Sequence, residues 1–377
     1  MAERPGFGLY VHWPFCQAKC PYCDFNSHVA SQVDQHRWGK ALVSEIRRIG
    51  RETGDRVLDS IFFGGGTPSL MEPGTVDRVI SAARDVWAPS NQMEITLEAN
   101  PTSAEAARFL GYAAAGVNRL SIGVQSLRDA DLRALGRLHT AAEAREAVAL
   151  ARSIFERVSF DLIYARQHQS LTAWKDELAE ALSFGPDHLS LYQLSVEEGT
   201  AFGDRLRRGR LAGLPHEDLA ADMFEMTQEM TLSAGLPGYE VSNHAVPGNE
   251  SRHNLIYWRS GDWAGVGPGA HGRMTTSGGR IATEHHASPG AWIKAVETTG
   301  SGESNRELMS GESAFEEAVM MGLRLSEGIP LIGISADLLY KINELEESGL
   351  LGYVSGRLRT TQAGRPVLNH ILRQLLT

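Results

Sequence analysis

Short apolar segments alternate with longer segments of helical period over the first 235 residues. An apolar run followed by apolar residues at i, i+4 and i+8 is the pattern of a buried strand and of a helix that packs on it. The alternation predicts an α/β fold with a parallel sheet. Strands are expected at residues 9–13, 60–63, 94–97, 119–124, 158–163 and 188–194.

The helical segments fall between these strands, at residues 38–49, 74–86, 103–115, 142–154, 171–184 and 216–234. Six βα units are fewer than a closed barrel of eight requires, but they suit a partial (β/α)6 barrel resembling a TIM barrel. Reactive groups are then expected on the loops that follow the C-terminal ends of the strands.

Helical period is lost over residues 236–305, where Gly, His, Asn and Trp occur in irregular order. This texture predicts loops and short strands that close the barrel. Within it, His285 and His286 resemble a metal-binding pair. Adjacent residues in an extended segment point in opposite directions, so a solvated loop is the favoured interpretation.

Residues 306–377 form a second predicted domain, of the α+β class. Two helices at 313–325 and 335–347, a hairpin at 351–361 and a last helix resemble a winged-helix module. Such modules often bind DNA, but the second helix carries Glu344, Glu346 and Glu347, which would repel phosphates. Packing or docking to a partner is favoured over DNA binding.

Charge and composition narrow the function. The 377 residues contain 36 Lys and Arg against 46 Asp and Glu, a net charge of -10 that disfavours nucleic acid as a partner. Residues 1–8 lack the apolar centre of a signal peptide, and no apolar run is long enough to span a membrane. A cytoplasmic location is expected.

The only cysteines are Cys16, Cys20 and Cys23, directly after the first predicted strand. An odd and clustered set excludes a disulfide framework. A zinc site, three inert cysteines and a [4Fe-4S] cluster remain as alternatives. Zinc lacks a second Cys-x-x-Cys pair to complete four ligands, whereas a cluster held by three thiolates leaves one iron open for a small molecule. The cluster is favoured.

The motif Cys-x3-Cys-x2-Cys, with Tyr22 before its last cysteine, resembles the signature of the radical S-adenosylmethionine (SAM) family. The resemblance implies a [4Fe-4S] cluster on Cys16, Cys20 and Cys23, with SAM bound at the open iron. The stretch Phe-Phe-Gly-Gly-Gly-Thr-Pro at residues 62–68 resembles the family's glycine-rich element, which approaches the methionyl end of SAM.

Further motifs, including residues 121–126, 160–164 and 189–194, resemble the branch that contains coproporphyrinogen dehydrogenases and HemW-like heme chaperones. Residue-by-residue matching implies contacts with the SAM on the cluster from Tyr10, Gly65 and Glu98. It implies a second SAM site lined by Tyr22, Gly66, Thr67, Gln125, Arg137 and Asp161.

Phe25 decides between the two members of this branch, because the dehydrogenases carry a further cysteine at that position. The resemblance therefore implies a chaperone that binds heme reversibly and transfers it to respiratory or storage hemoproteins, with no catalytic residue assigned. The cluster and SAM would be coupled to transfer or to formation of a homodimer. His253, in His-Asn-Leu-Ile-Tyr-Trp at residues 253–258, is the candidate axial ligand of heme.

One loop departs from the branch. After Tyr164 the family often continues Gly-Leu-Pro-Gly-Gln-Thr, whereas residues 165–170 read Ala-Arg-Gln-His-Gln-Ser. The loss of two glycines and a proline is expected to change the backbone of this loop and its contacts.

A coproporphyrinogen dehydrogenase and a zinc-bound interaction protein remain as alternative functions, and transient contact with a membrane surface is left open.

Overall fold

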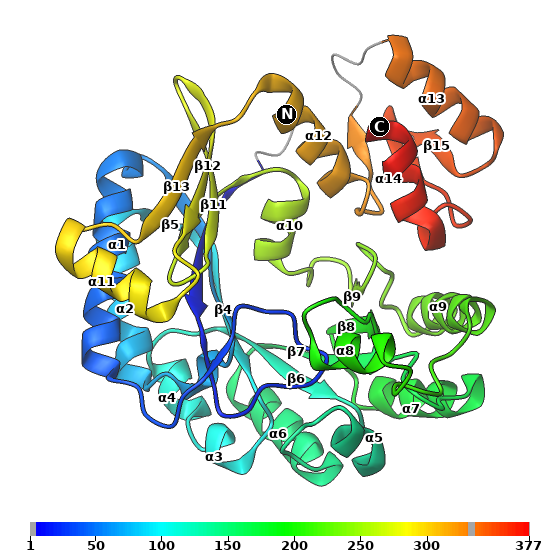
Figure 1. Ribbon diagram of the computed structural model, residues 1–377, viewed down its shortest axis with the longest axis horizontal. Coiled ribbons are helices and arrows are strands. Elements are labelled where there is room, and N and C mark those ends of the chain that lie inside the picture. Colours follow the sequence, from blue (N-terminus) through cyan, green and yellow to red (C-terminus); the bar gives the residue numbers. More distant parts are fainter. Residues whose placement is uncertain (1–4, 331–335, 377) are drawn as a thin grey trace.

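The computed structural model describes residues 5–330 and 336–376, and its main feature is one mixed sheet of eleven strands. All predicted strands of the barrel are confirmed, and they pair in parallel in chain order (Figure 1). They are β1 (Phe7–Trp13), β4 (Val57–Gly65), β5 (Ala88–Ala99), β6 (Arg119–Gln125), β7 (Arg157–Tyr164) and β8 (His188–Gln193).

Helices connect these strands and cover the outer face of the sheet (Figure 1). The helix expected at residues 103–115 is two short helices, α3 and α4. The other expected helices form as predicted, and two short helices, α5 and α8, were not expected. The bounds are α1 (Gln35–Thr53), α2 (Pro73–Val86), α3 (Ser103–Ala106), α4 (Phe109–Ala114), α5 (Asp129–Ala134), α6 (Ala141–Ile154), α7 (Leu171–Ser183), α8 (Ala201–Arg207) and α9 (Glu217–Ser233). None of the described helices is long and apolar enough to cross a membrane.

The spacing of apolar residues explains how α1 packs. Trp38, Leu42, Ile46 and Ile49 are all buried and belong to the main hydrophobic core, as their helical period predicts. Burying side chains of this size stabilises the fold by about 1.5–3 kcal/mol each. Side-chain caps set several helix starts, among them the capping box of Thr140 and Glu143 at α6.

The region expected to hold only loops and short strands contains more regular structure than that. It forms β9 (Asn243–Ala245), α10 (Arg252–Trp258), β10 (Asp262–Val266), β11 (His271–Thr276), β12 (Gly279–His285), α11 (Pro289–Thr299) and β13 (Glu303–Leu308). β10 pairs in parallel with β1, and β11 to β13 extend the sheet beyond it. Among the described strands, β13 and β9 are opposite ends of the sheet, so these strands lengthen it instead of closing it.

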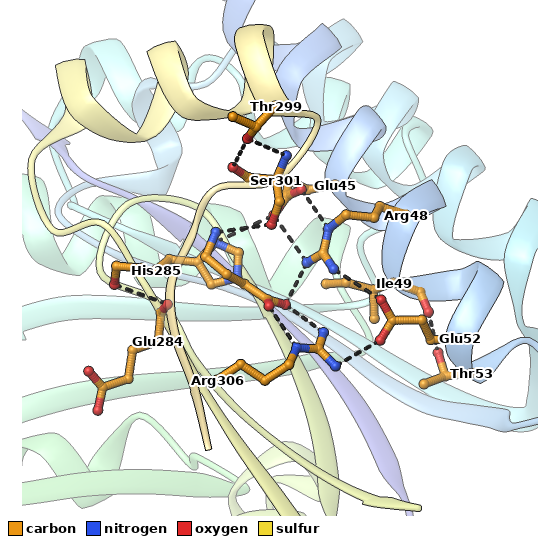
Figure 2. Close-up of polar contacts among 12 residues, drawn as sticks. Glu45, Arg48, Ile49, Glu52, Thr53, Glu284, His285, Thr299, Ser301 and Arg306 are labelled. Carbon is orange, nitrogen blue, oxygen red and sulfur yellow. Dashed lines mark hydrogen bonds and ion pairs between the residues drawn. The ribbon is translucent and has the colours of Figure 1, made fainter. Parts of the chain in front are cut away.

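His285 lies in the core, and the interpretation of its segment as a solvated loop is wrong. The indole Nε1 of Trp292 donates to His285 Nδ1 at 3.0 Å, and Glu45 lies 3.6 Å from the same nitrogen. Figure 2 shows the His285 ring between α1 and the strands that carry it. The chain after β12 turns back as α11, which buries His285 beneath Trp292, while His286 is half-buried.

An ion-pair network fastens the added strands to α1. Arg48 of α1 pairs with Glu45 at 2.9 Å and with Glu303 of β13 at 2.6 Å. Arg306 of β13 pairs with Glu303 at 2.8 Å and reaches back to Glu52 of α1 at 2.9 Å (Figure 2). Because the pairs share partners and several are shielded from water, the network resists screening better than isolated surface pairs.

The C-terminal elements have a core of their own, which includes Leu323, Ile342, Leu351 and Ile371. The hairpin turns at Ser355 and Gly356 as predicted, and both have positive φ, as a two-residue hairpin turn requires. The elements are α12 (Gly311–Gly322), β14 (Ile329–Pro330), α13 (Ala336–Glu347), β15 (Leu351–Val354), β16 (Arg357–Thr360) and α14 (Leu368–Leu376). Helix α12 contacts α10, next to the barrel (Figure 1).

Replacement of Trp292 tests how much the buried contact between α11 and α1 contributes. The Trp292 ring is fully buried and stacks on Trp38 with centroids 5.4 Å apart. Trp292→Ala is expected to lower the free energy of unfolding by about 3–5 kcal/mol, measured by urea denaturation. Thr298→Ala, on the exposed side of α11, is the control and should change it by less than about 0.5 kcal/mol. Equal effects of the two substitutions would contradict this packing.

Candidate cofactor site

The three cysteines lie on a short closed loop after β1. The loop leaves through β2 (Phe15–Cys16) and returns through β3 (His28–Val29), and these two strands pair in parallel. Within it, the Cys23 N–H donates to the Cys20 carbonyl at 3.1 Å. Cys16 is buried, Cys20 and Cys23 are half-buried, and all are free thiols. The loop thus presents three thiols from one compact segment.

The glycine-rich segment after β4 lies directly against this loop. Gly66 N–H donates to the Trp13 carbonyl at 2.7 Å, and Thr67 N–H donates to the Phe15 carbonyl at 2.9 Å. A Cβ atom on Gly66 would stand 2.9 Å from the Phe15 carbonyl oxygen, and Gly65 has a φ of +112°. Glycine is needed at Gly66 for the close approach and at Gly65 for the positive φ. These two residues therefore set the distance between the glycine-rich segment and the cysteine loop.

One side-chain contact ties the glycine-rich segment to a thiol. The Thr67 hydroxyl donates to the Cys16 sulfur at 3.4 Å. Burial raises the pKa of Cys16, and this hydrogen bond opposes the rise because it favours the thiolate. Thr67 therefore favours the charge state that a metal-bound cysteine requires.

A cavity of about 390 Å³ opens above these loops, at the C-terminal ends of the barrel strands. Its volume is in the range of small-molecule and cofactor sites. All predicted site residues except Tyr10 and His253 line it. They are Cys16, Cys20, Tyr22, Cys23, Gly65, Gly66, Thr67, Glu98, Gln125, Arg137 and Asp161.

Two carboxyl groups from the strands on either side of β6 face this cavity, Glu98 near the end of β5 and Asp161 in β7. Burial raises the pKa of Glu98 to about 8, and repulsion from Asp161 adds to the rise. Burial likewise raises the pKa of Asp161 to about 6. A ligand with positive charge would stabilise the ionised forms, so this part of the cavity favours a cationic group.

Several polar atoms at the cavity are buried without a hydrogen-bond partner: Gln125 Oε1, Asp161 Oδ1 and Arg137 Nε. Buried polar atoms nearly always have partners, so these three indicate a polar ligand. SAM carries a sulfonium, an ammonium, a carboxylate and ribose hydroxyls, which match the two carboxyl groups, the Gln125 amide oxygen and the Arg137 guanidinium. The residues present therefore fit SAM.

Asn100 and Tyr192 also line the cavity, although neither was predicted to be a site residue. The Asn100 amide donates to Thr67 Oγ1 at 3.4 Å, and its oxygen accepts from Arg137 at 2.5 Å. Asn100 directly follows β5, and Tyr192 lies near the end of β8. Their place at C-terminal strand ends was the signal that could have identified them.

His253 lies in the interior, outside the cavity. It is 1% exposed, Ser60 Oγ is 2.7 Å from its Nδ1, and the Tyr257 hydroxyl is 2.8 Å from its Nε2. Burial lowers its pKa to about 3, so the imidazole is neutral. In this conformation neither ring nitrogen is free to coordinate iron. Heme ligation by His253 would require loss of the Tyr257 hydrogen bond and movement of the ring out of the core.

Tyr10 stacks on the His253 ring with centroids 6.3 Å apart and also lies outside the cavity. Its hydroxyl is 3.0 Å from His12 Nδ1, and His12 Nε2 is 2.9 Å from the carbonyl of Asn26. Asn26 belongs to the cysteine loop. Tyr10 is thus connected to the cysteine loop by hydrogen bonds through His12.

The atypical loop at residues 165–170 keeps a glycine-like backbone. Ala165 and His168 have φ angles of +56° and +59°, in the region that glycine favours. The His168 N–H donates to the Gly213 carbonyl at 2.6 Å, and no residue of the loop lines the cavity. Ala165 and His168, which stand where the family often has glycine, therefore hold a left-handed backbone that is strained for residues with a Cβ atom.

Comparison with protein families matches two parts of the chain. Residues 10–181 match the radical SAM superfamily, and residues 309–367 match the HemN C-terminal domain. In the solved structures, coproporphyrinogen III oxidase (HemN) from Escherichia coli covers all of this chain and 92% of its own, with a TM-score of 0.82 and 21% sequence identity. That likeness shows that the two proteins share a fold.

Curated relatives match nearly the whole chain. The heme chaperone HemW of Escherichia coli is 36% identical over all of both chains. HemW of Mycobacterium tuberculosis is 36% identical over all of this chain and 97% of its own. The mitochondrial radical S-adenosyl methionine domain-containing protein 1 of Bos taurus is 40% identical over 98% of this chain and 87% of its own. With identities of this size over its full length, the chain belongs to the HemW family of the radical SAM superfamily.

Proposed function

We propose that this protein is a heme chaperone that binds heme reversibly and transfers it to acceptor hemoproteins. The observation that carries the proposal is the full-length identity of 36% to a relative named as a heme chaperone. Phe25 supports it, because the related dehydrogenases carry a further cysteine at this position of the loop. The cluster and SAM would regulate transfer or the association of two copies of the chain.

In this proposal Cys16, Cys20 and Cys23 hold a [4Fe-4S] cluster, and the cavity beside them holds SAM. The cluster supplies an open iron that chelates the amino and carboxylate groups of SAM. Glu98 and Gly65 would bind the SAM on the cluster. The second SAM site would be formed by Tyr22, Gly66, Thr67, Gln125, Arg137 and Asp161.

The alternatives rest on weaker support. A coproporphyrinogen dehydrogenase is suggested by the fold shared with HemN, but at 21% identity that likeness carries the fold alone. A zinc-bound interaction protein needs four ligands around one ion. The chain has only three cysteines, so a fourth zinc ligand would have to come from another residue type.

Metal and sulfide analysis tests the cluster. After anaerobic reconstitution, the protein is expected to contain iron and sulfide in a ratio of about four to four. Cys16→Ala should abolish this content. Ser27→Ala is the matched control, because its hydroxyl lies 3.8 Å from the Cys23 sulfur and yet is not a proposed ligand. Stoichiometric zinc without sulfide would contradict the proposal.

Heme binding separates the chaperone from the dehydrogenase. Titration of hemin into the reconstituted protein should give a saturable absorption change, and an added apo-hemoprotein should remove the heme. Incubation with coproporphyrinogen, SAM and reductant should yield no protoporphyrinogen. Formation of that product would establish the dehydrogenase instead.

His253→Gln tests whether this histidine is a core residue. Its pKa of about 3 lies below the ordinary 6.5, so the unfolded state binds the proton first and the stability of the folded protein falls as the pH drops below 6.5. At pH 5 the loss of unfolding free energy caused by His253 is about 2 kcal/mol. The His253→Gln variant has no imidazole at this position and should not show this loss. Measurement is by denaturation at a series of pH values.

The same variant tests heme ligation. Because both ring nitrogens already have partners, the affinity for heme is expected to stay within about twofold of the unsubstituted protein, a difference below about 0.4 kcal/mol. A loss of tenfold or more with unchanged iron and sulfide would show instead that His253 leaves the core to bind heme.

A further inference from the structure

The turn that follows β6 is strained. Gln125 has a φ of +67°, and the Ser126 N–H donates to the Val124 carbonyl at 2.8 Å, across a single residue. This is the hydrogen bond of a γ-turn, whose form with positive φ is rare and unfavourable for residues with a Cβ atom. Such a conformation persists only where surrounding contacts enforce it.

Glu177 of α7 supplies those contacts. Its Oε1 accepts from the Ser126 hydroxyl at 2.6 Å and from the Leu127 N–H at 2.7 Å. Glu177 is 1% exposed, so both bonds form away from water, where a charged acceptor binds strongly. One buried carboxylate therefore holds the two residues directly after the strained position.

The other oxygen of Glu177 fixes this carboxylate in place. It pairs with Arg166 at 2.5 Å, and Arg166 also pairs with Asp131 of α5 at 2.7 Å. Arg166 is buried and donates to the Ile163 carbonyl at 2.6 Å, at the end of β7. The ion pair thereby links the turns after two neighbouring strands, and both turns contain a left-handed residue that is not glycine, Gln125 and Ala165.

The Gln125 side chain is the part of this turn that faces the cavity. Its Oε1 is buried without a partner. Its Nε2 lies next to Gly123, since a Cβ atom added to Gly123 would be only 3.0 Å from this nitrogen. Because the side chain direction depends on the backbone angles of Gln125, any relaxation of the turn would redirect this oxygen.

We propose that Glu177, oriented by Arg166, is a positioning residue that holds the strained turn so that the Gln125 amide oxygen points at bound SAM. The inference rests on the proposed placement of SAM in the cavity. Glu177 acts through Gln125 and touches no ligand itself, since it does not line the cavity.

A double-mutant cycle tests this. The affinity of the second SAM site, to which Gln125 is assigned, is measured by calorimetry on the full chain with reconstituted cluster, for Gln125→Ala, Glu177→Ala and the double variant. Each single change is expected to weaken binding about tenfold. The double variant should be no weaker than either single one, because Glu177 then has no Gln125 to position. Independent effects, about a hundredfold in the double variant, would overturn the proposal.

Two variants separate positioning from general loss of stability. Ser126→Ala removes one hydrogen bond to Glu177, is mild enough to fold, and should weaken SAM binding in the same direction. Glu45→Gln is the matched control, since Glu45 is also fully buried on a helix and paired with an arginine, Arg48 (Figure 2). It should lower stability and leave SAM affinity unchanged. A drop as large as that of Glu177→Ala would overturn the proposal.

A readout without ligand completes the test. Amide hydrogen exchange in the peptide containing residues 124–127 should accelerate in Glu177→Ala and not in Glu45→Gln. If the protein fails to bind heme but the cycle is non-additive, the chaperone function fails and the positioning role stands. An additive cycle in a protein that binds heme removes the positioning role alone, and absence of SAM binding in the unsubstituted protein overturns it as well.

Discussion

The close approach of two backbone segments is the constraint on which the site depends. The amides of Gly66 and Thr67 bond to the carbonyls of Trp13 and Phe15, at the point where the parallel strands β1 and β4 end. A side chain at Gly66 would push the segments apart, so the hydrogen bonds exist only because that position has none. The sheet delivers both segments to one edge, and the missing Cβ lets them join. This contact sets the distance between the cysteine loop and the glycine-rich segment, both of which line the cavity.

The polar groups that line the cavity beside the cysteine loop are costly to bury. Glu98 and Asp161 are held near each other under conditions that raise both pKa values, and Gln125 and Arg137 leave buried atoms unpaired. Each unpaired buried group costs about 1–3 kcal/mol. A ligand that carries positive charge and several hydrogen-bonding groups would supply partners for these groups, so their arrangement favours the binding of such a ligand.

How much the sequence could predict depended on whether a feature is local. Buried parallel strands are continuous apolar runs, and the cysteines are neighbours along the chain, so both were predictable. The environment of a histidine is different, because distant segments create it: Ser60 and Tyr257 enclose His253, and Trp292 covers His285. No local pattern reports such contacts. The short helices α10 and α11 were missed for a related reason, since each buries only two or three side chains and shows little helical period.

The strained turns show the same non-local dependence in the energetics. Gln125 and Ala165 adopt left-handed angles, and a single carboxylate on a helix about fifty residues beyond the first of them is bonded to both turns, directly and through Arg166. Glycine would remove the strain at either position, but at Gln125 it would also remove the side chain that faces the cavity. The chain therefore keeps a strained residue and enforces its conformation from elsewhere. At Ala165 the same support explains why a loop without its expected glycine retains a glycine-like backbone: the buried ion pair, more than the local sequence, determines its shape.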